Sequence, residues 1–403
     1  MIFRAEKDGI FFFDSINDKT YILPAVKFDE VTGALAAGEQ AIAALGLDPD
    51  IREAIRQNPQ VFLTELRRCE ELTPPPNAFS LPMLMNLELT TRCPLRCPQC
   101  YCDLYKGKDL SLDTALHFIR QAAALKIPNI NLSGGETLVY PHLFELIEAC
   151  AQGGLCAAVA LSGYGFDEAV LNRMVQAGVG EIYISLNGSI QEVNAASRDG
   201  YDLAVNALKV LKNGAFRNYY VNWVAHKSNI EDFPNVVALC KEYGVQKLVI
   251  IGFKPDSSHS LASAPTDDQL LQLADFIRHH DGTPNILVES CFSPLRAVTS
   301  QKFFGNINRG ITKGCGAGRD GISVNVDGQL TPCRHLEQPE AFDSIEDYWY
   351  HSKVLQQLRA VEDTPRTPCK ECKYSAYCLH CMAINLKLNG AVYKGNETCG
   401  LWK

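Results

Sequence analysis

Between residues 82 and 300 the chain alternates apolar stretches of strand length with amphipathic stretches of helical length. The strand candidates are Leu84–Leu89, Asn129–Leu132, Ala157–Leu161, Glu181–Leu186, Tyr219–Ala225 and Lys247–Gly252. Helical patterns lie between them, for example Leu112–Leu125, Phe144–Gly153, Asp167–Gly178 and Tyr201–Asn213. This alternation predicts an α/β fold in which β/α units surround a parallel sheet. In barrels built from such units, active-site groups lie at the carboxyl ends of the strands.

Three cysteines follow the first strand candidate in the spacing C-x3-C-x2-C, at Cys93, Cys97 and Cys100. This spacing brings three thiolates together on one short loop. A cubane iron–sulfur cluster normally takes four thiolates, so three would leave one iron open for chemistry. A zinc site is the alternative at this point, because zinc also takes thiolate ligands.

The overall composition is that of an ordinary globular protein, but the cysteine content is high. The 403 residues are 46% hydrophobic and 21% charged, with a net charge of −8, and they include 16 cysteines. The negative charge argues against nucleic acid or an anionic membrane as the main partner. With no signal-peptide pattern at the start and no run long enough to span a bilayer, we expect a cytoplasmic protein. Clustered cysteines in a reducing compartment more often bind metal or do redox work than form disulfides.

A second motif, Gly134-Gly135-Glu136, follows the second strand candidate. The two glycines allow the backbone to approach a ligand closely. The Glu136 carboxylate beside them can accept hydrogen bonds from an ammonium group. Alone, such a tripeptide is usually a turn; one strand after the cysteine loop, it points to a ligand site.

Together these motifs resemble those of the radical S-adenosylmethionine (radical SAM) enzymes. The resemblance implies a partial (β/α)6 barrel and a [4Fe–4S] cluster on Cys93, Cys97 and Cys100, whose open iron binds SAM. It also implies that Gly134, Gly135 and Glu136 hold the SAM amino group. A further pattern of the family, a strand-end serine followed by an arginine that contact polar parts of SAM, matches Ser185 and Arg198 with one extra residue between them. The family usually has an aromatic residue near adenine just before the third cysteine; here Gln99 stands there, with Tyr101 just after the cysteine.

Seven of the cysteines lie at or after position 315 and have a pattern of their own. Cys315 and Cys333 are followed by Cys369-x2-Cys372-x5-Cys378-x2-Cys381 and then Cys399. The pattern resembles the SPASM extension of radical SAM enzymes, which carries two auxiliary [4Fe–4S] clusters; a zinc ribbon is the alternative. By resemblance Cys369, Cys372, Cys378 and Cys399 hold the outer cluster, and Cys315, Cys333 and Cys381 hold the inner one. The family usually has three residues, not two, before the cysteine that matches Cys381.

The inner cluster lacks an obvious fourth cysteine. Its iron could be open to a substrate thiolate, or Cys291 could fill the place. Cys291 could instead be a catalytic hydrogen-atom donor near the barrel mouth, or simply a small buried residue. Cys69, Cys150, Cys156 and Cys240 lie in helical patterns and are expected in the core.

Residues 1–80 form a small separate α+β unit in this prediction, with strands at Gly9–Phe13 and Thr20–Leu23, helices near 38–45 and 50–69, and a stiff proline linker at 74–76. Its order and length resemble a RiPP recognition element, which binds the leader of a ribosomally made precursor peptide as an added strand. A cap packed on the barrel is the alternative. Residues 81–300 would then be the radical SAM core and 301–403 the SPASM domain, held largely by metal.

The resulting prediction is a radical SAM/SPASM peptide maturase. The resemblance implies that the SAM-derived radical removes hydrogen from a precursor peptide, which ends as a thioether or C–C crosslink, an epimer or an oxidised residue. It also implies an electron donor such as flavodoxin or ferredoxin. A sulfatase-type protein maturase and a zinc-stabilised binding protein without catalysis are the alternatives.

Overall fold

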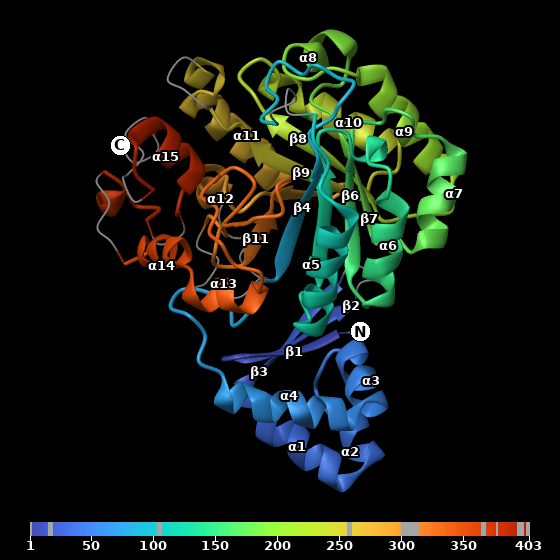
Figure 1. Ribbon diagram of the computed structural model, residues 1–403, viewed down its shortest axis with the longest axis vertical. Helices are drawn as coiled ribbons and strands as arrows, with labels where there is room; N and C mark the ends of the chain where they lie inside the picture. Colours follow the sequence, from blue (N-terminus) through green and yellow to red (C-terminus); the bar gives the residue numbers. More distant parts are fainter. Residues whose placement is uncertain are drawn as a thin grey trace.

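The computed structural model describes residues 2–14, 19–102, 107–255, 260–299, 314–363, 368–375, 378–392 and 399. In this part of the chain the strands form a nine-stranded sheet, in the order β10-β9-β8-β7-β6-β5-β4-β11-β12, and a separate three-stranded sheet. The large sheet occupies the middle of the molecule and the small one lies at its N-terminal end (Figure 1).

The six predicted core strands are confirmed, and they lie side by side in chain order. They are β4 (Leu84–Thr90), β5 (Asn129–Gly134), β6 (Cys156–Leu161), β7 (Glu181–Ser185), β8 (Tyr219–Ala225) and β9 (Lys247–Gly252). Each pairs with the next in parallel register. This consecutive order is that of the predicted (β/α)6 arrangement, because each helical crossover returns the chain to the neighbouring strand.

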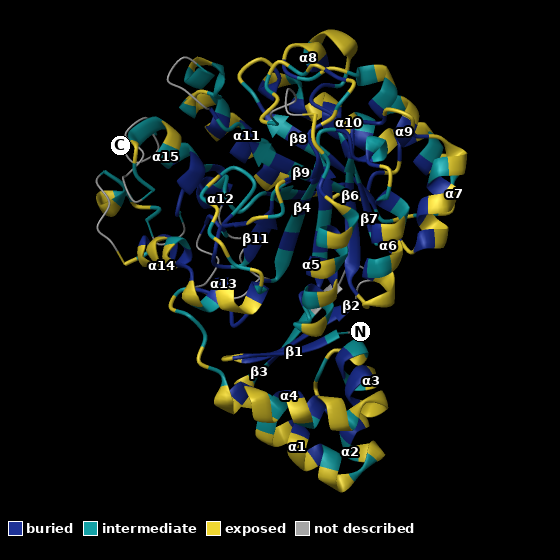
Figure 2. Ribbon diagram, viewed as in Figure 1, coloured by how far each residue is buried: buried dark blue, intermediate teal, exposed yellow. Residues whose placement is uncertain are grey.

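Helices cover one face of this sheet. The four predicted ones are α5 (Leu112–Ala124), α6 (Leu143–Gln152), α7 (Glu168–Ala177) and α9 (Tyr201–Asn213). Their ends follow from the sequence: Ser111 and Asp167 cap helix starts, and Gly178 ends α7 in the left-handed conformation. Two further helices, α10 (Phe233–Glu242) and α11 (Asp267–His279), continue the series. Their outer surfaces are exposed while the sheet is buried (Figure 2).

The two faces of β4 differ in chemistry, and this difference creates the site. Met85, Leu87 and Leu89 are fully buried in the main hydrophobic core. The alternating residues Asn86 and Glu88 face the other side, where they line a pocket. Because side chains alternate along a strand, one short segment both anchors the core and supplies polar groups to the interior.

The C-terminal segment extends the barrel sheet, which the sequence pattern did not predict. β11 (Gly321–Val324) pairs in parallel with β4, and β12 (Leu330–Thr331) pairs antiparallel with β11. β10 (Asn285–Val288) is added in parallel at the opposite edge, beside β9. The C-terminal segment itself also contains α13 (Ile345–His351), α14 (Lys353–Ala360) and α15 (Met382–Asn389). Its buried residues belong to the main core cluster, so this part of the chain shares the barrel's core.

The N-terminal unit contains the two predicted strands and one more. β2 (Gly9–Asp14) is the central strand, paired antiparallel with β1 (Ile2–Glu6) and β3 (Lys19–Pro24). The helices are α1 (Phe28–Ala37), α2 (Glu39–Ala43), α3 (Pro49–Gln57) and α4 (Pro59–Glu71). The predicted helix over 50–69 is therefore two helices, because Pro59 cannot continue a helix and instead begins a new one.

This unit has its own core and a buried polar attachment to the rest of the chain. Ile10 and Phe12 pack under the helices, while Phe11 and Phe13 pack against Phe79 of the linker. Arg4 lies 2.8 Å from Glu6 and donates to the carbonyl of Pro82 at 2.6 Å. Glu6 in turn accepts from the backbone nitrogen of Ser80 at 2.8 Å. Burial lowers the pKa of Arg4, and the Glu6 carboxylate opposes that effect.

No helix in the described part of the chain is both long enough and apolar enough to cross a membrane.

The Arg4–Glu6 pair predicts a large stability effect. Replacing Glu6 by Ala leaves the Arg4 charge buried without its carboxylate, which costs about 3–5 kcal/mol. The urea midpoint of the N-terminal unit should fall accordingly. Glu53→Ala is the matched control, because Glu53 pairs with Arg56 at the exposed surface. An equal fall in both variants would contradict the assigned role of the buried pair.

Candidate active site

The cysteine loop begins where β4 ends and is fixed by backbone hydrogen bonds. Thr91 donates to the carbonyl of Lys108 at 2.8 Å, and the nitrogen of Cys100 donates to the carbonyl of Cys97 at 3.1 Å. Cys93 and Cys97 are half-buried and Cys100 is exposed. The three predicted ligands thus lie together on one loop at the carboxyl end of the first core strand.

The glycine pair lies directly against this loop. Gly135 donates to the carbonyl of Thr90 at 2.6 Å, and Glu136 donates to the carbonyl of Arg92 at 2.9 Å. A Cβ atom on Gly135 would lie 2.3 Å from the Arg92 oxygen and 3.2 Å from the Cβ of Cys93. A side chain there would displace the cysteine loop, so the glycine is required by close approach.

Glu136 is fully buried and already hydrogen-bonded. Its Oε2 accepts from the backbone nitrogen of Ser162 at 2.9 Å and from the Ser162 hydroxyl, and its Oε1 accepts from Leu138 at 3.1 Å. Burial raises the pKa of Glu136, while the bonds from Ser162 and Leu138 and the charge of Arg198 lower it. These bonds fix the direction of the carboxylate and leave further acceptor positions for an ammonium group. Ser162, just after β6, was not predicted as a site residue, because a serine after a strand carries no specific signal.

Ser185 and Arg198 reach the same end of the sheet. Ser185 is the last residue of β7, and the charge of Arg198 acts on both Cys100 and Glu136. A buried amide network holds the intervening loop: Asn187 accepts from Trp223 through its backbone and donates from its side chain to Ser197 at 3.0 Å. Asn194 donates to the carbonyl of Arg198 itself at 2.8 Å. The sequence prediction missed this network, since isolated asparagines resemble ordinary turn residues.

Cys102 is a hydrogen-bond donor beside the predicted ligands. Its thiol contacts the carbonyl of Gly134 at 3.2 Å. A side-chain hydrogen bond between Cys102 and Cys100 lowers the pKa of Cys100 to about 6. The same bond, together with burial, raises the pKa of Cys102. Cys100 is therefore the better thiolate of the two.

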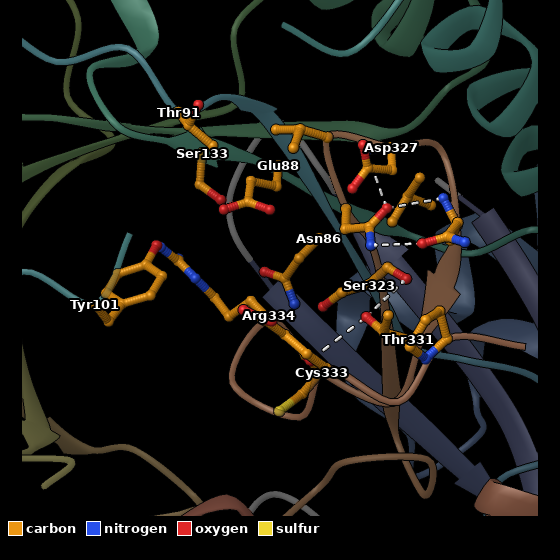
Figure 3. Close-up of a pocket in the computed structure, with 16 residues that line it drawn as sticks. Asn86, Glu88, Thr91, Tyr101, Ser133, Ser323, Asp327, Thr331, Cys333 and Arg334 are labelled. Atoms are coloured by element: carbon orange, nitrogen blue, oxygen red, sulfur yellow. Dashed lines mark hydrogen bonds between the residues drawn. The ribbon is translucent and has the colours of Figure 1, made fainter. Parts of the chain in front are cut away.

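Gln99 and Tyr101 face different surroundings. The Oε1 atom of Gln99 is buried and has no hydrogen-bond partner in the part of the chain that is described. Tyr101 is 41% exposed, and its ring lies under the Arg334 guanidinium at 4.2 Å and beside the His335 ring at 4.6 Å. The cysteine loop therefore contacts the residues that directly follow Cys333, as Figure 3 shows.

Four distant cysteines meet in a second group. The Cys381 thiol is hydrogen-bonded with those of Cys291 and Cys315, which lowers the pKa of Cys381 and raises the other two. Burial raises the pKa of Cys333 to about 12, and the charge of Cys381 adds to that effect. The backbone nitrogen of Cys315 also donates to the carbonyl of Leu379 at 2.9 Å, which holds the two segments together.

Lys254 lies beside this second group. Burial alone would lower its pKa, but the charges of Cys291, Glu289 and Cys381 raise it well above the usual value. Its Nζ atom lies 3.1 Å from Glu289. A cation placed there offsets the charge of the neighbouring thiolates.

Three of the remaining C-terminal cysteines, Cys369, Cys372 and Cys378, lie on one short segment. Cys372 donates to the carbonyl of Cys369 at 3.2 Å, and its sulfur accepts from the nitrogen of Tyr374. The backbone nitrogen of Cys378 donates to the carbonyl of Tyr374 at 3.0 Å, and Cys399 is half-buried.

The described residues include no group of three or more His, Cys, Asp or Glu side chains that could hold a metal ion. Cys69, Cys150, Cys156 and Cys240 are buried, as predicted. The helical placement of Cys156 was wrong: it is the first residue of strand β6, because its apolar run continues directly into the strand.

Comparison with known proteins agrees with this arrangement. Residues 87–257 match the family model of the Radical SAM superfamily. The structure of SuiB from Streptococcus suis bound to S-adenosylmethionine superposes with a TM-score of 0.72 at 17% identity, covering 99% of this chain and 98% of that one. SuiB bound to its precursor peptide SuiA gives 0.73 at 16% identity, over the same shares. Native anSMEcpe with bound AdoMet and a Cp18Cys peptide gives 0.63 at 16% identity, covering 79% of this chain and 94% of that one. At these identities the likeness shows a shared fold.

The Gly135 contact predicts a local loss of metal. Gly135→Ala forces a Cβ against the Arg92 carbonyl, and overpacking of this kind costs roughly 1–3 kcal/mol. Anaerobically reconstituted protein should contain less iron and sulfide per chain than the wild type. Gly33→Ala is the control, because its Cβ would meet nothing within 4 Å. Full iron content in Gly135→Ala would show that the loop accommodates the side chain.

Proposed function

Because residues 87–257 form a radical SAM domain, we propose that this chain is a peptide maturase that cleaves SAM reductively. Cys93, Cys97 and Cys100 would hold a [4Fe–4S] cluster, and Glu136 would accept from the amino group of SAM. The observation that carries the proposal is the close packing of Gly134 and Gly135 against the cysteine loop. There is no space for a side chain at either glycine. With a cluster and SAM bound there, the site would be supplied with the electron and the radical chemistry needed to remove a hydrogen atom from the peptide.

The chain's own residues then have distinct tasks. Ser162 orients the Glu136 carboxylate, and the asparagine network holds Arg198 near Glu136 and Cys100. Ser185 and Arg198 would contact the polar parts of SAM. Gln99 and Tyr101 flank the third ligand, where the buried acceptor of Gln99 suits a donor group of the cofactor.

The second cysteine group supports a role for Cys291 as the fourth ligand of the inner auxiliary cluster, with Cys315, Cys333 and Cys381. The Cys291 thiol is hydrogen-bonded to that of Cys381, which favours a role as a ligand over one as a hydrogen-atom donor. Cys369, Cys372, Cys378 and Cys399 would hold the outer cluster. An electron donor such as flavodoxin or ferredoxin would supply the electrons.

The N-terminal sheet has one closed edge and one open edge. The outer edge of β1 is engaged, because the backbone nitrogen of Ala5 donates to Glu65 of α4 at 2.8 Å. The outer edge of β3 makes no backbone hydrogen bond with another described segment. A leader peptide added as a strand would therefore pair with β3. SuiB has been crystallised with its precursor peptide, which supports a substrate of this class.

A sulfatase-type protein maturase is the second candidate, because anSMEcpe shares the fold and has been crystallised with a peptide. That likeness covers 79% of this chain, whereas the SuiB likeness covers 99%. The wider match favours the peptide maturase.

Three substitutions test the SAM site. Replacing Cys93, Cys97 or Cys100 by Ala should reduce dithionite-driven formation of 5′-deoxyadenosine to background, because each removes a ligand. Cys102→Ala is the comparison variant; as a partner of a ligand its loss should cost roughly 10–100-fold and leave activity above background. Colourless, zinc-loaded wild-type protein that forms no 5′-deoxyadenosine would instead support the zinc-stabilised binding protein.

Deleting residues 1–75 tests the leader-binding role. The first step is to search beside the gene for a short open reading frame. The peptide that such a frame encodes, labelled with fluorescein, should bind at least about tenfold more weakly by anisotropy, since a lost strand interface removes well over 1 kcal/mol. Formation of 5′-deoxyadenosine without peptide should persist, which shows that the barrel is folded. Unchanged peptide affinity would assign the N-terminal unit to packing alone.

A further inference from the structure

A pocket of about 190 Å³ lies between the SAM-site loop and the C-terminal hairpin. Its walls come from β4 and β5 on one side and from β11, β12 and the residues after them on the other (Figure 3). Thr91 and Tyr101 of the cysteine loop line it, and so does Cys333 of the inner group. Its volume is below the ≈300–1,000 Å³ of sites for drug-sized ligands, which suits a single amino-acid side chain or chain end.

Arg334 is the one cation that lines this pocket in the described part of the chain. Its guanidinium is stacked on Tyr101 at 4.2 Å. It donates to no acceptor among the described residues, although a guanidinium carries five N–H donors. The Arg334 side chain is half-buried where it lines the pocket.

Two neutral polar groups on the floor of the pocket are also unsatisfied. The Ser323 hydroxyl is buried, at 2% exposure for the residue, and has no hydrogen-bond partner among the residues described. Asn86 accepts from Asn131 at 3.0 Å, and its own amide nitrogen donates to no group in the described ranges. β11 is paired with β4 so that Ser323 lies directly opposite Asn86. Available donors therefore converge in the pocket.

The acidic residues that line the pocket do not satisfy Arg334. Asp327 pairs with Lys108, and Glu337 is exposed at the rim. Glu88 takes part in an interaction of its own; its charge acts on Arg334, but no ion pair within 4 Å joins the two among the described side chains. A half-buried guanidinium that stacks on an aromatic ring and keeps its donors available is well suited to bind a planar carboxylate.

We propose that this pocket binds a carboxylate of the peptide substrate, with Arg334 on the Tyr101 ring as its ion partner and Ser323 and Asn86 as further donors. The proposal deepens, and rests on, the proposed peptide maturase function. The carboxylate is either an Asp or Glu side chain or the C-terminus of the peptide. Binding there holds the peptide between the SAM loop and the inner cysteine group.

The test uses reconstituted, SAM-bound full-length protein and small probes in ligand-observed NMR titrations. N-acetyl-glutamate α-amide presents a side-chain carboxylate, N-acetyl-alanine presents a terminal one, and N-acetyl-glutamine α-amide and N-acetyl-lysine α-amide are the neutral and cationic counterparts. One of the carboxylate probes should bind at least about tenfold more tightly than the glutamine probe, and which one does so identifies the source.

Arg334→Gln should abolish this preference, and Arg334→Lys should keep part of it, because the charge remains while the planar stack is lost. Arg120→Gln is the matched control, since Arg120 is exposed on α5 and lines no part of the pocket. Ser323→Ala should weaken the preferred probe several-fold, and it serves as a second variant if Arg334→Gln does not fold.

Equal binding of the carboxylate and glutamine probes, tighter binding of the lysine probe, or an unchanged preference in Arg334→Gln would each overturn the proposal. Loss of SAM affinity in Arg334→Gln would also overturn it, by assigning the guanidinium to SAM. Failure of wild-type protein to form 5′-deoxyadenosine would refute the maturase function alone, because the probe preference is measured without turnover.

Discussion

The contact between the end of β5 and the cysteine loop is the constraint on which the site depends. Gly135 and Glu136 donate to the carbonyls of Thr90 and Arg92, so two neighbouring parallel strands continue to pair beyond the sheet. That pairing fixes where Cys93 lies, directs Glu136 inward and leaves no space for a side chain at Gly135. The cysteine loop is thereby part of a rigid framework, which a group that binds a cluster needs.

A second consequence follows from where the C-terminal segment joins the barrel. Because β11 pairs with β4, the same strand that leads into the cysteine loop also supports the hairpin that leads to Cys333. The Tyr101–Arg334 stack then closes the gap between the two cysteine groups. In the proposed function this places the modified part of the peptide next to both the radical source and the inner auxiliary cluster.

Much of this architecture could be predicted from sequence, and the misses have physical causes. The six core strands carry either near-continuous apolar runs, as in β6, or apolar residues that alternate with polar ones, as in β4, and both patterns are strong signals. β1 was missed because its residues include Arg4 and Glu6, whose burial is made possible only by their mutual pairing. β11 was missed because a short Gly-Ile-Ser-Val strand has almost no pattern of its own. Ser162 and the asparagine network were missed because their roles depend on which strands are neighbours.

The sequence by itself determined the local chemistry. The spacing of Cys93, Cys97 and Cys100, the glycine pair with Glu136, and the late cysteine pattern are local features, and local spacing decides which thiolates can share a loop. Tertiary structure decided which distant groups meet. Cys291 joins Cys381 and Cys315, Cys102 donates to Cys100, and Arg334 stacks on Tyr101. These contacts depend on strand order and on β11 joining β4, and strand pairing between distant segments is set by the packing of the whole core rather than by any local pattern.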